Sequence, residues 1–140
     1  MKVLLDTNVV LDVLLARAPH GGPAAQLFNL IDRGRLKGAL CATTFTTIHY
    51  LAAKAAGRQL AKKQVRQLLA MFEVAPVDQV VLSRAVELAF GDFEDAVVHE
   101  AARAIGAEAI VTRNGKDFES ATVPVFSPIE FLSGIDAAKS

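Results

Sequence analysis

Residues 2–12, KVLLDTNVVLD, decide the fold of this 140-residue chain. Val3, Leu4 and Leu5 show no alternation of polar and apolar side chains, which is the pattern of a strand buried on both faces, as in a parallel sheet. Asp6 follows directly, and an unpaired carboxylate is costly in such a place. Asp6 therefore either caps the next helix or belongs to a site that needs negative charge.

Length and composition fit one α/β domain that spans residues 1–140. Aromatic residues make up only 6% of the chain, so Leu, Val, Ile and Ala must fill the core. No apolar run reaches the roughly 20 residues of a membrane span, and no signal-peptide pattern is visible, so we expect a cytoplasmic protein. The single cysteine, Cys41, excludes an internal disulfide and a Cys-rich zinc site, and we expect a buried, inert thiol.

Charge is unevenly distributed although the formal net charge is zero. No acid lies between Asp32 and Glu73, a stretch that contains Arg33, Arg35, Lys37, Lys54, Arg58, Lys62, Lys63 and Arg66. Such an asymmetry favours a polyanionic partner such as nucleic acid. The alternative is that these charges form ordinary solvated helix faces.

Strand-like and helix-like segments alternate along the rest of the chain. After the first strand, the pattern predicts further strands at 37–42, 73–77, 108–112 and 123–126. It predicts helices at 9–18, 23–34, 43–57, 60–72, 79–90, 93–106 and 127–132, with a turn and a short helical piece at 113–118. Strands separated by helices imply a parallel sheet covered on both faces.

Polar residues follow the strands of this predicted sheet. The carboxyl ends of parallel strands share one edge, where ligands generally bind. Asp6 ends the first strand, Asn114 and Asp117 follow a later one, and Asp92 and Asp95 open a helix whose N-terminus can reach the same edge. Four carboxylates gathered there would repel one another unless a cation lay among them.

A site rich in aspartate and poor in histidine suits Mg²⁺ or Mn²⁺. Such an ion lowers the pKa of a bound water and neutralises charge on a phosphodiester. A side-chain nucleophile is disfavoured, because there is no GxSxG motif and Cys41 has no evident histidine partner. The pattern therefore favours metal-assisted hydrolysis.

Four motifs, LLDTNVVLD (4–12), DFEDAVVHEAA (92–102), AIVTRNGKDF (109–118) and VFSPIEFL (125–132), occur in this order. At these residues the chain resembles the PIN-domain family of metal-dependent ribonucleases, in particular its small prokaryotic members related to VapC-type toxins. The resemblance implies a three-layer α/β fold with a central parallel sheet of four to five strands, and hydrolysis of RNA with Mg²⁺ or Mn²⁺. Likeness to the toxin branch further implies a cognate antitoxin and a homodimer.

The resemblance also implies roles for individual acids. Asp6 matches the family's first acid and Asp95 its later helix acid, while Asp117 matches an acid often found downstream and Asn114 stands where Asp is common. Asp92 precedes Asp95 by one helical turn, so it can share the same face as a further ligand. Capping remains an alternative role for Asp92 and Asp117, because each stands near the start of a helical segment.

Other positions support the site or depart from the pattern. Asn8 and Thr112 match the family's small polar and hydroxyl residues. His49 stands, in our alignment, where members usually carry a glutamate; it is either a metal or phosphate ligand or a helix residue with no catalytic role. We expect His99 to be an exposed helix position.

RNA contacts are expected from basic residues in two regions. The first group is Lys54, Arg58, Lys62, Lys63 and Arg66, and the second group, which flanks the acids, is Arg113 and Lys116.

Two other functions compete with the ribonuclease. A catalytically weakened or inactive PIN-like module that binds RNA or assists assembly is supported by the missing glutamate at His49. A metal-dependent phosphohydrolase of small phosphate esters would share Asp6 after a strand, but Asn8 interrupts the DxD pattern of aspartyl-phosphate enzymes.

Overall fold

The computed structural model describes the backbone of residues 1–139 and the side chains of residues 1–135. Its centre is a five-stranded sheet in the order β3-β2-β1-β4-β5, in which every neighbouring pair is parallel. The strands are β1 (Lys2–Leu5), β2 (Lys37–Cys41), β3 (Glu73–Ala75), β4 (Ala109–Val111) and β5 (Val125–Phe126). The predicted parallel sheet and its five strands are confirmed.

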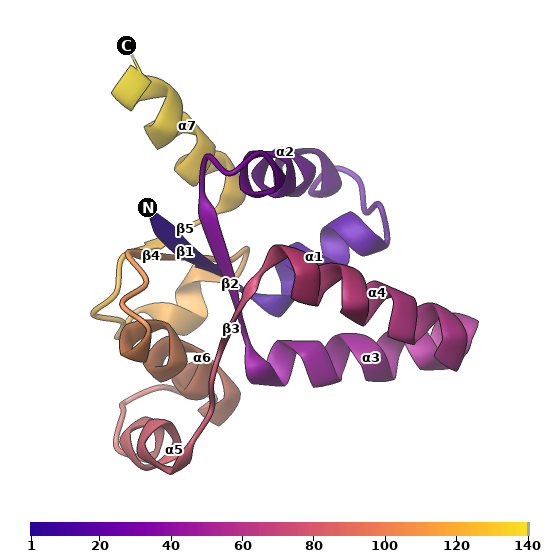
Figure 1. Cartoon of the computed structure of the whole chain (residues 1–140). Coiled ribbons are helices and arrows are strands. Elements are labelled where there is room, and N and C mark those ends of the chain that lie inside the picture. Colours follow the sequence, from indigo (N-terminus) through magenta and orange to yellow (C-terminus); the bar gives the residue numbers. More distant parts are fainter. Residues whose placement is uncertain (140) are drawn as a thin grey trace.

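Helices cover both faces of the sheet, as Figure 1 shows. They are α1 (Thr7–Leu14), α2 (Gly21–Asp32), α3 (Ala42–Ala56), α4 (Arg58–Met71), α5 (Gln79–Val86), α6 (Phe93–Ala104) and α7 (Pro128–Lys139), with a 3₁₀ helix, η1 (Gly115–Phe118). None of the helices described is long and apolar enough to cross a membrane.

The two faces of β1 serve two separate cores, because successive strand side chains point in opposite directions. Val3 and Leu5 pack with α1, α2, α3, α4 and α7, whereas Leu4 packs with α5 and α6. All three side chains are fully buried. The unbroken apolar run of β1 is therefore explained by helices that cover the strand on both faces of the sheet.

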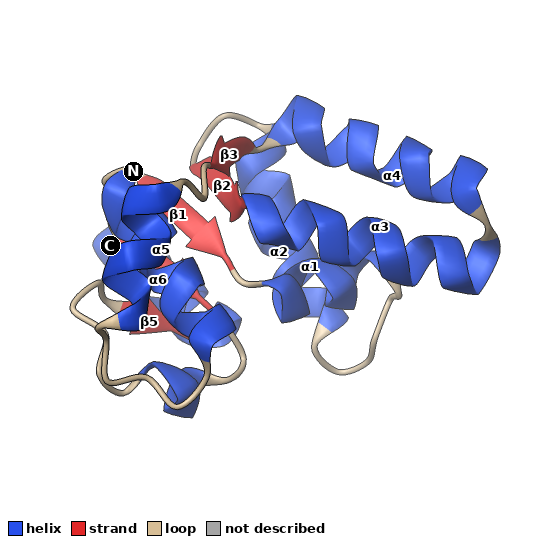
Figure 2. Cartoon of the chain, turned by 90° about the horizontal axis from the view of Figure 1, so that it is seen from below, coloured by secondary structure: helices blue, strands red, loops and turns tan. Residues whose placement is uncertain are grey.

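Helices α3 and α4 form a hairpin that extends away from the sheet (Figure 2). Gly57, with a φ of 94°, makes the tight connection between them. A positive φ of this size is favourable only for glycine, so the position of Gly57 in the sequence fixes where the hairpin turns.

Two helices end four residues earlier than predicted. Helix α1 ends at Leu14 instead of residue 18, where the chain turns through Ala16 with a φ of 48°. Helix α5 ends at Val86 instead of residue 90. Beyond it, Phe90 turns inward and stacks edge-on against Phe118 at 5.8 Å between ring centroids, so tertiary packing overrides the helical pattern.

The expectation of an exposed His99 is wrong, because His99 is fully buried in α6. Its Nε2 accepts the backbone N–H of Thr122 at 3.0 Å, and its Nδ1 lies 2.9 Å from Oε2 of Glu100. Glu100 is also buried and accepts a hydrogen bond from Arg103. A histidine with partners on both ring nitrogens can be buried without losing hydrogen bonds, which the sequence pattern does not reveal.

Candidate metal centre

Asp6 stands at the carboxyl end of β1, in the middle of the sheet, and only 8% of its surface is exposed. Its Oδ1 accepts the backbone N–H of Thr7 at 2.8 Å, which makes it the N-cap of α1. Its Oδ2 accepts hydrogen bonds from Thr112 Oγ1 at 2.8 Å and from Asn8 Nδ2 at 3.3 Å. Burial raises the pKa of Asp6 despite these bonds, and the charge of Asp117 raises it further. Asp6 is thus both a cap and a buried acid.

Asn8 and Thr112 tie the start of α1 to the end of β4. Asn8 Nδ2 also donates to Thr112 Oγ1 at 3.2 Å, and Asn8 Oδ1 accepts the backbone N–H of Arg113 at 3.2 Å. Thr112 Oγ1 in turn accepts the backbone N–H of Asn114 at 3.1 Å. These short polar side chains hold Asp6 in place and begin the turn that carries Asn114.

Asp92 and Asp95 lie in the first turn of α6. Asp92 Oδ1 accepts the backbone N–H of Asp95 at 3.1 Å, so the predicted capping role of Asp92 is confirmed. Asp95 is partly buried, and its pKa is raised to about 7, first by burial and then by the charges of Asp6, Asp92, Asp117 and Glu94. Acids from the end of β1, the start of α6 and η1 therefore act on one carboxyl group.

The acids surround a common region without meeting at one point. Within residues 1–135, no three His, Cys, Asp or Glu side chains are arranged to hold an ion together. The same part of the chain shows no ion pair to Asp6, Asp92, Asp95 or Asp117. Repulsion among them is therefore not relieved by a basic side chain.

An open cleft of about 400 Å³ borders Asp92 and Asp117. Lys116, Glu119, Ser120 and Gly91 also contribute to its wall. Every acidic donor in this region offers carboxylate oxygen, the ligand type that Mg²⁺ and Mn²⁺ prefer, and the open cleft leaves room for the waters that Mg²⁺ retains. These donor types suit a hard divalent cation, although Asp6 and Asp95 do not line this cleft.

The first turn of α3 also borders the acids. Thr44 Oγ1 lies 2.8 Å from Thr7 Oγ1, and the charges of Asp6 and Glu94 help to raise the pKa of the buried Cys41 thiol, after burial itself. The expectation of a buried Cys41 is confirmed.

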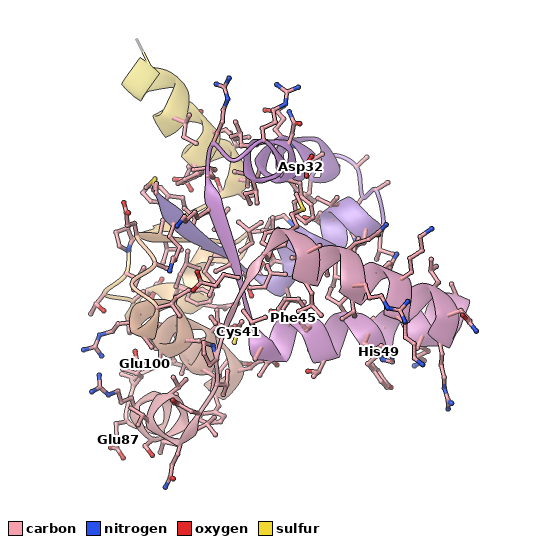
Figure 3. All side chains as sticks on the ribbon, in the orientation of Figure 1. Asp32, Cys41, Phe45, His49, Glu87 and Glu100 are labelled. Carbon is pink, nitrogen blue, oxygen red and sulfur yellow. The ribbon has the colours of Figure 1, made fainter. Side chains whose placement is uncertain are left out.

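His49 follows Cys41 by about two helical turns, or roughly 12 Å along α3. Figure 3 shows the two side chains well apart on that part of the chain. His49 is half-buried. The structure thus places His49 on the helix that borders the acids but well beyond its first turn, and a role as metal ligand stays a prediction.

The basic residues fall into two groups with different surroundings. Lys54, at the end of α3, and Arg58, Lys62, Lys63 and Arg66, on α4, are all exposed on the protruding hairpin. Lys116 is exposed beside the cleft.

Arg113 is differently placed, because its guanidinium is paired with Asp12. Asp12 is a fully buried acid of α1 that sequence reasoning missed. The available signal was an acid inside the apolar run VVLDVLL, which is unusual at a core-facing position.

Comparisons with known proteins show the family and the fold of this chain. The family model described as PIN domain matches residues 2–116. Ribonuclease VapC1 of Aquifex aeolicus is 24% identical over 135 residues, which cover 93% of this chain and 92% of that protein.

Solved structures of similar fold include a toxin-antitoxin complex from Klebsiella pneumoniae, with a TM-score of 0.67, 24% identity and coverage of 90% of this chain and 97% of that one. Another is VapC20 of Mycobacterium tuberculosis, described as a Sarcin-Ricin loop cleaving toxin, with a TM-score of 0.65, 15% identity and coverage of 87% and 98%. The family model spans most of the sheet and all the candidate metal-binding acids except Asp117, and the chain belongs to the PIN-domain family.

Proposed function

We propose that this chain is a divalent-metal-dependent endoribonuclease and acts as the toxin of a type II toxin-antitoxin pair in the cytoplasm. The observation that carries the proposal is the gathering of unpaired acids from β1, α6 and η1 at the carboxyl edge of a parallel sheet. The similarity of the chain to proteins described as ribonucleases and as members of toxin-antitoxin complexes supports RNA as the proposed substrate.

Asp6 and Asp95 would hold Mg²⁺ or Mn²⁺, with Asp92 and Asp117 assisting directly or through water. When bound, the ion supplies a water of lowered pKa and neutralises charge on the phosphodiester. Thr112 and Asn8 orient the carboxylate of Asp6 through their hydrogen bonds.

Asn114 and Lys116 are both exposed and Lys116 lines the cleft, so both would be available to the substrate. The direct test is cleavage of a mixed RNA by the purified chain with Mg²⁺ or Mn²⁺. We expect cleavage with either ion and none with a chelator, and equal cleavage in both conditions would contradict metal dependence.

Positive charge on the α3–α4 hairpin would hold the RNA backbone without reading its sequence. We expect Lys62→Glu with Lys63→Glu to weaken RNA binding by about 10-fold or more at moderate salt, because two phosphate-attracting charges are reversed. Fluorescence anisotropy with a labelled RNA over a salt series measures this effect, and Mn²⁺ affinity should not change.

The matched control for the hairpin is Arg33→Glu with Arg35→Glu, which reverses two exposed charges in the turn between α2 and β2. The control should weaken RNA binding much less. Equal losses of RNA affinity in both double variants would show that only the net charge of the chain matters. Unchanged RNA binding in the hairpin variant would show that Lys62 and Lys63 do not contact RNA.

A protein partner is expected at the groove between α1, α3 and α4. This groove of about 360 Å³ is lined mostly by apolar side chains, among them Leu14, Leu15, Leu51 and Leu60. Leu15, Leu51 and Leu60 are exposed, which suits an apolar helix of an antitoxin.

The partner is tested by co-expression with the product of the adjacent gene and by mass measurement in solution. We expect a stable complex that blocks RNA cleavage, and a homodimer of the 14.9 kDa chain when it is alone. A monomer that forms no complex would contradict both assignments.

A catalytically weakened RNA-binding module is the second candidate, favoured by His49 where family members usually carry glutamate. It predicts RNA binding without saturable Mn²⁺ binding. A metal-dependent phosphohydrolase would instead turn over small phosphate esters, and a trapped phosphoaspartate at Asp6 would support it.

A further inference from the structure

Asp12, which is fully buried, forms an ion pair with Arg113, whose side chain is 25% exposed, and the pair is separate from the candidate metal-binding acids. Asp12 has no exposed surface, and the guanidinium of Arg113 donates through Nε to Oδ2 and through Nη2 to Oδ1, the latter at 3.2 Å. Arg17 adds a weaker contact, with Nη1 3.7 Å from Asp12 Oδ1. A two-pronged pair of this kind fixes the orientation of the guanidinium as well as its position.

Arg113 is held at its backbone as well as at its side chain. Its backbone N–H donates to Asn8 Oδ1 at 3.2 Å, and Asn8 and Asp12 are four residues apart in α1, on one face of the helix. One face of α1 therefore binds both the backbone and the side chain of Arg113, the residue after Thr112.

These contacts with Arg113 lie at the start of the segment 112–117, which carries Asn114 and Asp117. Thr112 Oγ1 donates to Asp6 and accepts from the backbone N–H of Asn114, and the N–H of Asp117 donates to the carbonyl of Asn114 at 3.0 Å. Asn114 and Asp117 themselves are exposed. The ion pair with Asp12 adds a charged anchor to this segment, beside the hydrogen bond from the Thr112 N–H to the Phe126 carbonyl at 2.9 Å.

We propose that Asp12 and Arg113 are positioning residues that fix the segment 112–117 against α1 and so set the places of the Asp6 and Asp117 carboxylates for a divalent cation. The proposal rests on the function proposed above. It gives Arg113 a role other than contact with RNA phosphate, because both prongs of its guanidinium are engaged by a buried carboxylate.

The first test is Asp12→Asn, which removes the charge and keeps the size of the side chain. We expect the Mn²⁺ dissociation constant to rise about 10-fold or more and kcat to fall, while KM for RNA stays the same or decreases because Arg113 is released. Calorimetric titration with Mn²⁺, well below the melting temperature of each variant, measures the first effect. A contact with RNA phosphate alone would instead leave Mn²⁺ affinity unchanged.

Arg113→Met and Arg113→Lys keep the proposal testable if Asp12→Asn does not fold. Arg113→Met leaves Asp12 with Arg17 as a partner, and Arg113→Lys keeps the charge but loses the second prong. We expect both to weaken Mn²⁺ binding, with Arg113→Lys the milder variant. Wild-type affinity in the folded variants would overturn the proposal.

The matched control is Glu100→Gln, the same chemical change in another buried carboxylate. Glu100 pairs with Arg103 and His99 in the later part of α6. This variant should melt at a lower temperature with unchanged Mn²⁺ affinity, which separates a general loss of stability from a loss of positioning.

Amide hydrogen exchange separates failure of this proposal from failure of the proposed function. If the wild type binds no Mn²⁺, the metal-dependent function fails, but Asp12→Asn should still speed exchange in 112–117 about 10-fold or more, with little change in α6. Unchanged exchange in that segment would overturn the positioning role by itself.

Discussion

Asp95→Asn is expected to lower metal-dependent RNA cleavage about 100-fold or more while the domain stays folded. The reason is that Asp95 is proposed to bind the ion directly, and an amide is a much weaker ligand for Mg²⁺ than a carboxylate. Initial rates of cleavage with saturating Mg²⁺, beside a melting curve, measure both quantities. Glu94→Gln is the matched control, since Glu94 is an exposed acid in the same turn of α6.

The same variant is expected to be more stable than the wild type at alkaline pH without metal. The folded state raises the pKa of Asp95 from 3.8 to about 7, so it keeps a proton that the unfolded chain releases. The raised pKa therefore lowers the free energy of unfolding. This loss is absent below about pH 4, grows as pH rises from about 4 to about 7, and is complete above about pH 7.

Removing the carboxylate removes that loss of stability. We expect a gain of about 1–2 kcal/mol in the free energy of unfolding at about pH 8, less than the full shift implies, because solvent screens a partly exposed group. Urea denaturation with a chelator at about pH 4 and pH 8 measures it. Cleavage at the wild-type rate by Asp95→Asn, or an equal loss of cleavage in Glu94→Gln, would rule out Asp95 as a metal ligand.

Asp6→Asn is the second large effect, with an expected loss of cleavage of about 100-fold or more. Asn can still accept the N–H of Thr7 through its oxygen, but its NH₂ group would face Asn8 Nδ2, which is also a donor. We therefore expect a loss of about 1–2 kcal/mol in stability, partly offset because a buried charge is removed. Cleavage rates and urea denaturation measure the two effects.

The control for Asp6 is Asp78→Asn, because Asp78 caps α5 by accepting the N–H of Val81 at 2.9 Å and is not among the acids that raise the pKa of Asp6 or Asp95. If Asp6 were only a cap, both variants would keep activity and nearly all of their stability, because Asn caps a helix about as well as Asp. Retained cleavage in Asp6→Asn would therefore remove Asp6 from the metal site.

The fold was predictable where local pattern and topology agree. The unbroken run Val3 to Leu5 predicted a strand covered on both faces, and the two cores confirm this. The helix ends at Leu14 and Val86 were not predictable, because they depend on where the following chain packs.

The candidate site was predictable from topology and less so from local sequence. The shared edge of parallel strands is enough to bring Asp6 near Asp117, and the charges of both act on Asp95. The pair between Asp12 and Arg113 joins residues 101 positions apart, so no local pattern shows it.

Titration of the wild-type chain with Mn²⁺ tests the central claim most directly. Because Asp95 must lose its proton to bind the ion, calorimetry in buffers of different ionisation enthalpy should show saturable binding that releases protons at about pH 6.5 and few at about pH 8.5. Asp6→Asn and Asp95→Asn should abolish this binding. Absence of saturable binding in the wild type, or the same binding in Asp95→Asn, would contradict a metal centre built from these acids.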